Sequence, residues 1–471
     1  MSVESISRRL DRLPVSRFHY RLVGLIAGGI FFDGFDVYLA GAVLGALVKS
    51  GVSDLHQNAL FISATFAGMA IGAFLAGYLG DKFGRRFSYQ ANLAIFGIAS
   101  IAGALAPSMS WLIGFRFFMG IGLGAEIVLG FAMLSEFLPP AVRGKWAAAL
   151  AFVANSSLLA ATLLGYLIIP VLGWRWMFAI AGVGALYMLY LRKAMPESPR
   201  WLASKGRIEE AREIVTEIEI ECGAQQQDEE PEAGASIEAA APTRVLSKTE
   251  VGRRLLVASV INIVTGLALY GFVSWIPTFL VKQGFNIAAS LGYTTLMSIG
   301  GPLGAVLSHF LADRIGRKAG LVVSSLGIIG FGWFYCDAST APVLVGAGFG
   351  LVTSIYFLLS IGSATYVPEL FETVYRMRAV GTASTFGRVA SMISPFVIVA
   401  AFETWGILGI YTVLSIGLVI MCVLVMLLGI ETRGRSLEAI GRPQNTSAHG
   451  ANDEHVFENR GSSPLNEGNK L

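Results

Sequence analysis

The chain has 471 residues, of which 54% are hydrophobic and 14% charged, and its mean hydropathy is +0.63. Charged residues make up roughly a quarter of an ordinary soluble protein, so this composition excludes a soluble enzyme or binding module and indicates an integral membrane protein. The net charge is only +3, and the scattered cysteines Cys222, Cys336 and Cys422 suggest neither a disulfide framework nor a zinc site.

Apolar runs long enough to cross a bilayer recur along the whole chain. The first 20 residues are basic and polar, with no cleavage site before Leu22, so we expect the first run to be retained as a membrane helix. Only helices or closed barrels can cross lipid. We therefore predict an all-α membrane protein with 12 transmembrane helices, near residues 21–48, 57–79, 87–106, 110–134, 145–170, 173–194, 253–281, 288–311, 319–336, 341–365, 380–402 and 405–430.

The first predicted helix carries two carboxylates, Asp33 and Asp36, near its middle. On insertion scales an acid at a helix centre costs about 2.5–3.5 kcal/mol, so we expect a functional reason for both. They are three residues apart and therefore share one face of the helix. At about 1.5 Å per residue, Asp36 and Arg116 of the fourth helix reach the same depth from opposite sides of the membrane. We predict that these two charges meet.

Such a pair could couple transport to protons. Desolvation favours the neutral form of a carboxylate and a nearby guanidinium favours its charged form, so moving Arg116 would switch Asp36 between the two. A permanent structural pair would use the same residues. Asp33 could bind cargo, shape the proton path or contact water in a cavity. Glu126, about 15 Å beyond Arg116 on the fourth helix, is either an inner proton relay or a water-facing acid.

The loops predict the topology. Lys and Arg concentrate in every second loop, which places both termini in the cytoplasm by the positive-inside rule. After the sixth helix, the sequence predicts short helices with Ser198 as N-cap and Pro199 in the first turn. An acidic flexible linker is expected after these helices, and the C-terminal tail is expected to be disordered from about Arg442. The predicted parts are a cytoplasmic N-terminal segment (1–20), an N-terminal six-helix bundle (21–194), a cytoplasmic central loop (195–252), a C-terminal six-helix bundle (253–430) and a cytoplasmic, largely disordered tail (431–471).

The later helices supply candidates for cargo binding. Arg388 lies about two and a half turns into the eleventh helix, where a guanidinium suits a cargo carboxylate but could equally bind carbonyls of a neighbouring helix. Aromatic rings on the first and seventh helices could hold a flat ring, although most phenylalanines here should pack or face lipid. The predicted cargo-binding residues are Arg388, Tyr270, Trp275, Tyr38 and Phe35.

The two halves of the chain repeat. GDKFGRR (80–86) returns as ADRIGRK (312–318), SEFLPPAVRG (135–144) as PELFETVYRMRAVG (368–381), and PESPR (196–200) as IETRG (430–434), all at a nearly constant offset. This pattern predicts two pseudo-symmetric six-helix bundles around a central cavity. DGFDVY in the first helix aligns with YGFVSW in the seventh, so the acids occur in one half only, which favours a chemical over a scaffolding role.

With these motifs the chain resembles the major facilitator superfamily over nearly its whole length. GYLGDKFGRR resembles the loop between the family's helices 2 and 3, and RFFMGIGLGAE, PESPRWL and ETRGRSLE resemble the sugar-porter and metabolite:proton symporter branches. The seventh helix lacks the paired glutamines of sugar porters, and the fifth lacks the Gly-Pro motif of drug:proton antiporters. DGFD and GAE are most similar to aromatic-acid and nicotinate-type transporters. Glu372 stands where the family more often has Pro.

The resemblance implies a proton-coupled importer of a small organic acid, aromatic or nicotinate-like, that works by alternating access. A sugar, polyol or other metabolite symporter and a non-transporting membrane sensor are the alternatives. It also implies a cytoplasmic network that latches the two halves shut; solvated basic loops would explain its cations but not its repeated acids. The residues of this predicted gate are Asp81, Arg85, Arg86, Glu136, Arg143, Asp313, Arg317, Glu369 and Arg378.

The histidines show no metal-binding spacing, and GIGLG (120–124) lies inside a membrane helix rather than after a strand, so no enzyme is predicted. We expect no cofactor, no bound metal and no nucleic-acid partner. The expected partners are a small-molecule substrate, protons and the lipid bilayer. The expected state is a monomer that crosses the cell membrane many times, in the inner membrane of a bacterium.

Overall fold

The computed structural model describes residues 3–223, 248–371 and 373–433, and these residues are nearly all helical. Ten helical segments are long and apolar enough to cross a membrane. One of them, Arg378–Leu428, contains the non-helical residue Gly406 (φ 64°) and consists of two helices. α4 (Arg85–Ala104) also lies at a predicted span, but polar residues in its first turns lower its hydropathy. The predicted all-α membrane fold is therefore confirmed.

The N-terminal half is built from regular α-helices. Turn residues set their ends: the Asp54 carboxylate accepts a hydrogen bond from Gln57 N (2.7 Å) at the start of the second span, and Gly84 has a φ of 106° before the third. The helices are α2 (Arg17–Lys49), α3 (Leu55–Phe83), α4, α5 (Met109–Phe137), α6 (Pro140–Leu172) and α7 (Arg175–Leu191), followed by the 3₁₀ turn η1 (Arg192–Ala194).

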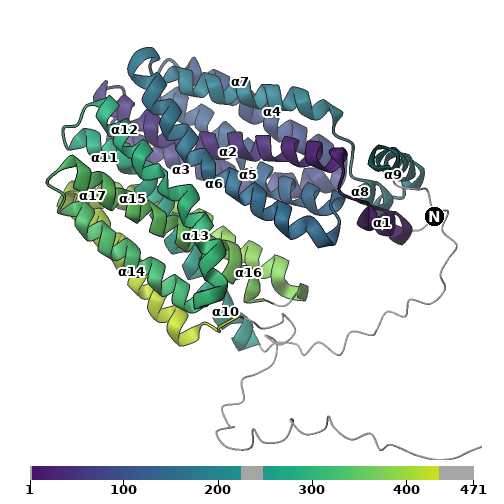
Figure 1. Cartoon of the computed structure of the whole chain (residues 1–471). Helices are drawn as coiled ribbons and strands as arrows, with labels where there is room; N and C mark the ends of the chain where they lie inside the picture. The colour runs from purple at the N-terminus through teal and green to yellow at the C-terminus, as the bar shows by residue number, and fades with distance from the viewer. Residues whose placement is uncertain (1–2, 224–247, 372, 434–471) are drawn as a thin grey trace, which may run out of the picture.

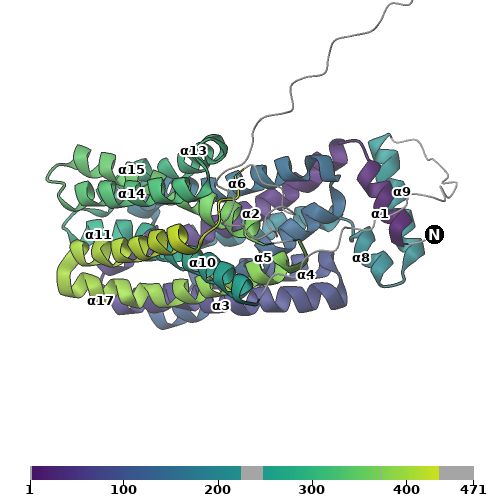
Figure 2. The ribbon, with the colours of Figure 1, turned by 90° about the horizontal axis from the view of Figure 1, so that it is seen from below.

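The C-terminal half has breaks in its helices that the sequence did not predict. Its seventh span changes from α-helix to a π-helical turn, η2 (Leu267–Phe272), and its tenth contains another, η4 (Leu359–Tyr366). The other elements are α10 (Lys248–Gly266), η3 (Val273–Trp275), α11 (Ile276–Lys282), α12 (Ile287–Ser298), α13 (Gly300–Ile315), α14 (Arg317–Cys336), α15 (Ala341–Leu358), α16 (Val367–Glu369) and α17 (Thr373–Leu428). Figure 2 shows the reversal of the chain within α17.

Three short helices, which we call the cap, cover one end of the N-terminal half. They are α1 (Val3–Arg12), α8 (Pro199–Ser204) and α9 (Ile208–Cys222), and they share an apolar core with the start of α2. The Ser198 side chain accepts from Trp201 N (3.2 Å), as the sequence predicts. Arg9 of α1 forms an ion pair with Glu219 of α9 (2.5 Å). The N-terminal segment is thus a packed helix of the cap.

The two halves lie side by side and spread apart toward the cap (Figure 1). We call the end of the bundle that carries the repeated loop motifs (80–86 and 312–318) the motif end, and the other the opposite end. Polar contacts between described residues of the two halves all lie in the part of the bundle nearer the opposite end. They are Ser63 Oγ to Met392 O (2.6 Å), Thr162 Oγ1 with Ser298 Oγ (2.8 Å) and His56 with Glu403 (3.6 Å). The described halves are therefore joined at the opposite end.

Some predictions lie outside the described residues. They concern the linker at 224–247, Glu372, the tail from 434 onward and the side chain of Asp313.

Candidate functional site

The predicted meeting of Asp36 and Arg116 is observed. Arg116 of α5 donates from Nη1 to Asp36 Oδ2, from Nη2 to the Asp36 carbonyl (2.8 Å) and from Nε to Thr65 Oγ1 (2.8 Å). The guanidinium also lies 4.9 Å from the centre of the Phe61 ring. Both charged side chains are buried, at 1% and 0% exposure. Asp36 Oδ1 has no hydrogen-bond partner, so the carboxylate keeps one free oxygen inside the protein.

A second buried ion pair joins Glu126 of α5 to Arg192 of η1. Arg192 Nη2 donates to Glu126 Oε1 (2.6 Å), to Tyr89 OH (3.0 Å) and to the Leu25 carbonyl (2.9 Å). Its guanidinium lies 3.9 Å from the centre of the Tyr89 ring. Glu126 is therefore buried and paired in this structure and does not face water. The sequence did not reveal Arg192, because an arginine at the end of an apolar run looks like an ordinary loop cation.

A glycine makes room for this second pair. A Cβ placed on Gly29 of α2 would overlap both Arg192 Nη2 and Glu126 Oε1. Gly28, Gly29 and Gly34 on the same helix all leave space for side chains of neighbouring helices. The glycines of the GGIFFDGFD stretch were the available signal, since a glycine within a membrane helix often marks close packing.

Asp33 lies on α2 between the levels of these two pairs. It is about one helical turn from Asp36 and from Gly29, so each step along the axis is about 4.5–6 Å. Its side chain is 3% exposed, and Oδ1 has no hydrogen-bond partner. Unlike Asp36 and Glu126, Asp33 forms no ion pair with the described part of the chain, although Arg192 and Arg388 lie within electrostatic range.

In the C-terminal half, the cation near this region is Arg388 of α17. It is partly exposed and makes no hydrogen bond or ion pair with any residue that the structure describes. Asp33 and Tyr270 are the described groups within its electrostatic range. The carbonyls of neighbouring helices, which the sequence left open as its partners, do not bind it in this structure. A free guanidinium near an unpaired carboxylate can bind an anion that enters between the halves.

Tyrosines from both halves surround this region. Tyr270, in the π-helical turn η2, stacks against Phe66 of α3 with ring centres 4.4 Å apart. Tyr38 of α2 lies within electrostatic range of Tyr356 of α15 and of Tyr270. The sequence did not single out Tyr356. Because the half-buried Tyr270 sits on a non-standard turn, its ring position depends on the local backbone, a common feature of functional sites.

The other predicted cargo-binding aromatics lie in packed surroundings. Phe35 is 1% exposed and stacks with Phe31 at 6.3 Å. Trp275 is fully buried and stacks with Phe279 at 5.8 Å, which in turn stacks with Phe402 at 5.0 Å. In this conformation these two rings support the helices rather than line an open surface.

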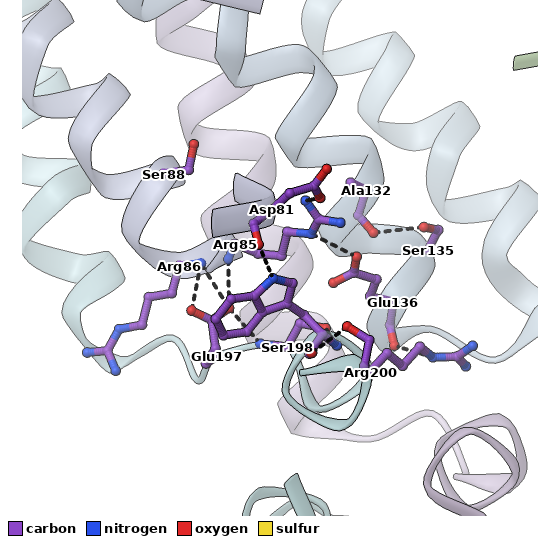
Figure 3. Close-up of polar contacts among 12 residues, drawn as sticks. Asp81, Arg85, Arg86, Ser88, Ala132, Ser135, Glu136, Glu197, Ser198 and Arg200 are labelled. Atoms are coloured by element: carbon purple, nitrogen blue, oxygen red, sulfur yellow. Dashed lines mark hydrogen bonds and ion pairs between the residues drawn. The ribbon is translucent and has the colours of Figure 1, made fainter. Parts of the chain in front are cut away.

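Four predicted gate residues of the N-terminal half, Asp81, Arg85, Arg86 and Glu136, form one network at the motif end (Figure 3). Arg85 binds Asp81 (2.8 Å) and Glu136 (3.2 Å), so it links α4 to α3 and α5. Glu197 Oε1 accepts from the backbone N–H groups of Arg85 (2.9 Å) and Arg86 (3.0 Å), and it therefore caps α4. Residues of α8 reach the same network through Arg200 Nε to Glu136 O (3.0 Å).

The C-terminal half repeats this arrangement. Arg317 binds Glu369 through two hydrogen bonds (2.8 and 2.9 Å), and Glu431 accepts from the backbone N–H groups of Arg317 (2.9 Å) and Lys318 (3.1 Å). Glu431 thus caps α14 as Glu197 caps α4. Arg378 is exposed.

None of these contacts joins the two halves: each cluster holds together helices of its own half. In the N-terminal cluster, Arg143 donates to the carbonyl of Leu138 (3.0 Å). The network between halves that the resemblance implied stays a prediction for a conformation closed at the motif end.

The chain is similar to known proteins over nearly its whole length. Residues 23–443 match the family described as sugar (and other) transporter. The inner membrane metabolite transport protein YdjE of Escherichia coli is 36% identical over 446 residues, which cover 93% of this chain and 98% of that protein. The niacin transporter NiaP of Acinetobacter baylyi is 31% identical over 440 residues, which cover 92% and 99% of the two chains.

Solved structures share the fold. The crystal structure of a D-xylose-proton symporter aligns with a TM-score of 0.68 and 20% identity, covering 90% of this chain and all of that one. This likeness agrees with the all-α membrane fold described above.

Proposed function

The chain belongs to the sugar (and other) transporter family of the major facilitator superfamily, and we propose that it is a proton-coupled importer of a small aromatic or nicotinate-like carboxylate. It is a multi-pass membrane transporter; we place it in a bacterial inner membrane with the motif end and both termini in the cytoplasm, because the basic loops lie at that end. The observation that carries the proposal is the buried, unpaired carboxylate of Asp33 in the N-terminal half, within electrostatic range of the Arg388 guanidinium, which has no partner among the described residues.

Alternating access is supported by where the halves touch. Their polar contacts lie toward the opposite end, and the loop clusters at the motif end hold each half together separately. This arrangement corresponds to a carrier that is closed outside and able to exchange cargo with the cytoplasm. Closing the motif end and opening the other would complete the cycle.

The proton side of the proposal rests on the Asp36–Arg116 pair. Asp36→Asn would leave the Arg116 guanidinium buried without its counter-charge, and Asp33, one turn away on the same face, is the nearest acid to replace it. Asp33 would then be held in its charged form. We expect the variant to lose proton-driven accumulation while exchange of cargo across the membrane survives in part.

Uptake into proteoliposomes tests this function. Labelled aromatic acids, short-chain acids and sugars are offered with an imposed pH gradient, alkaline inside, to wild type and Asp36→Asn. We expect wild type to accumulate an aromatic acid and the variant only to exchange it. Accumulation of a sugar instead would make the chain a sugar symporter, and accumulation at the wild-type level by Asp36→Asn would contradict the role of the pair. Absence of any uptake would favour a sensor.

Variants of Arg388 test whether the cargo is an anion. If Arg388 binds a carboxylate, Arg388→Ala should weaken binding of the acid by about 1.5–3 kcal/mol, or roughly ten- to a hundredfold, and Arg388→Lys should restore only part of it. The amide of the same compound should bind all three proteins almost equally. Competition binding measures both ligands. Equal losses for acid and amide would mean that Arg388 supports the helix bundle and not the cargo.

A further inference from the structure

The charges at the centre of the described bundle balance one another. Two of the three carboxylates are held by arginines of their own half, in the pairs Asp36–Arg116 and Glu126–Arg192. The remaining acid, Asp33, belongs to the N-terminal half, and the remaining cation, Arg388, belongs to the C-terminal half. We call the group formed by Asp33, Asp36, Glu126, Arg116, Arg192 and Arg388 the charged centre. With all six ionised, its net charge is zero.

On the basis of the proposed function, we propose that the cargo carboxylate replaces Asp33 as the counter-charge of Arg388 and that Asp33 then binds one proton. Each carboxylate group would thus enter with one proton, and the charged centre would be neutral both empty and loaded. The step moves only a proton: it leaves water, binds to one oxygen of the Asp33 carboxylate and is released when the cargo leaves.

The contacts of the three carboxylates explain why Asp33 is the one that binds the proton. Asp36 and Glu126 each bind a buried guanidinium directly, and protonating either would leave an arginine buried without its partner, which costs several kcal/mol. Asp33 has no such bond to lose, and its Oδ1 is buried and without a partner. It is therefore the carboxylate that can take up a proton at the smallest cost to its neighbours.

The groups around Asp33 make its charge state sensitive to the cargo. Within electrostatic range it faces the acids Asp36 and Glu126, the cations Arg192 and Arg388, and the hydroxyl groups of Tyr89 and Tyr270. Arg192 is already bound to Glu126, so Arg388 is the cation whose influence a cargo anion would cancel. A bound carboxylate near Arg388 also adds a negative charge beside Asp33, and both effects favour the protonated acid.

The position of Asp33 and Arg388 in different halves links this exchange to the transport cycle. An empty carrier holds the two halves toward each other through their opposite charges, and a carrier with cargo but no proton would bury a net negative charge. Burying an unpaired charge in the membrane is costly, so closure around the cargo is favoured only after the proton has bound. Cargo and proton would then cross together.

The experiment changes the driving force across proteoliposomes. For a cargo with one carboxylate, wild type should accumulate it with a pH gradient, alkaline inside, and not with a membrane potential alone, because one anion and one proton carry no net charge. One proton should enter per cargo molecule. The potential is set with potassium and valinomycin, and proton flux is followed with a pH-sensitive dye inside the vesicles.

In Asp33→Asn, the membrane potential should replace the pH gradient as the driving force for accumulation. Without a proton acceptor, the variant would carry the anion alone: the pH gradient should no longer drive accumulation, and an inside-positive potential should. Cargo binding should also become nearly independent of pH. A merely structural role of Asp33 would lower the rate without changing which gradient works. The double variant Asp33→Asn with Arg388→Gln keeps the centre neutral and serves as a folding control that should bind no cargo anion.

The outcomes separate this inference from the proposed function. If wild type shows no uptake of any acid under a pH gradient, the proposed function fails. If that uptake occurs but the potential alone also drives it, or two protons enter per carboxylate, only the inference is overturned. Accumulation by Asp33→Asn under a pH gradient would overturn it as well.

Discussion

The two halves of this transporter agree closely at the motif end and differ at the centre of the membrane. At the motif end, Arg85 with Glu136 and Glu197 in one half corresponds to Arg317 with Glu369 and Glu431 in the other, contact by contact. At the centre, the N-terminal half contains two closed ion pairs, whereas the C-terminal half contributes one free guanidinium. We infer that the repeated part serves the scaffold, and we propose that the unmatched part serves coupling and cargo.

The backbones differ in the same way. The described spans of the N-terminal half contain no π-helical turn, while the seventh and tenth spans of the C-terminal half contain η2 and η4. η2 carries Tyr270, and Tyr356 lies just before η4. We infer that the N-terminal half holds its charges in fixed positions and that the C-terminal half can adjust its backbone around the cargo.

The largest effect is expected when a buried ion pair of the N-terminal half is broken. Arg192→Leu leaves Glu126 buried without a counter-charge, which should cost about 3–5 kcal/mol of stability. Adding Glu126→Leu should recover most of that loss, because an apolar pair can replace a buried ion pair. The matched change in the other half, Arg388→Leu, should cost much less, since Arg388 has no hydrogen bond to lose among the described residues.

The stability of each of these proteins is measured by heating it in detergent and monitoring unfolding by size-exclusion chromatography. Equal losses of stability for Arg192→Leu and Arg388→Leu would contradict the difference between an arginine in a buried ion pair and one without a partner among the described residues.

The next effect concerns the space beside that pair. Gly29→Ala places a methyl group against Arg192 and Glu126, so it should cost about 1–3 kcal/mol by overpacking, and more if the ion pair separates. Gly24→Ala, on the same helix, is the control, because nothing lies within 4 Å of the added Cβ. The same unfolding assay applies. A Gly29→Ala protein as stable as Gly24→Ala would show that the pair can move aside freely.

A smaller effect is expected at the repeated clusters. The Asp81–Arg85 pair is exposed on the aspartate side (70%), so its loss should change any equilibrium by about 0.2–1 kcal/mol. If the clusters also latch the halves in a closed state, Asp81→Asn and Asp313→Asn should each move the population toward the state open at the motif end.

Labelling of an introduced cysteine from the cytoplasmic side would report this shift. Glu209→Gln removes another exposed acid (82%) from a pair on α9 and should change nothing. Unchanged labelling in both aspartate variants would count against a latch between the halves.

The smallest expected effect is a dependence on pH at the C-terminal cap. Burial raises the pKa of Glu431. Hydrogen bonds from backbone N–H groups, including those of Arg317 and Lys318, together lower it by more than burial raises it, so the pKa lies below its ordinary 4.5. A lowered pKa means that the charged form stabilises the fold above pH 4.5 and that this contribution disappears as the pH falls through the lowered pKa.

The difference in melting temperature between wild type and Glu431→Gln should therefore stay constant from pH 8 to about 5 and shrink in more acidic buffer. A difference that grows on acidification would reverse the assigned sign.

Much of the fold could be predicted because its signals are local. Apolar length predicts the spans, and Ser198 and Pro199 predict the start of α8. The equal depth of Asp36 and Arg116 followed from the constant rise of a helix per residue, and the family resemblance implied that the two helices are neighbours. In each case one physical constraint acts on a short stretch of sequence.

The remaining features depend on contacts between distant segments. Arg192 stands at a helix end, and only the packing of η1 against α2 and α5 turns it inward to Glu126. The π-helical turns η2 and η4 have no consistent marker in composition. Arg388 lacks a partner among the described residues because no described side chain of a neighbouring helix reaches it, and a sequence cannot show such distances.

The cap has a consequence for the order in which the protein is made. Arg9 of α1 and its partner Glu219 of α9 are separated by 210 residues. At about 5–20 residues per second, a ribosome needs roughly 10–40 s to synthesise the intervening chain. During that time α1 has left the exit tunnel without the surface on which it will rest, while α2 to α7 are being inserted. We therefore expect α1 to be among the last helices of its half to find its place.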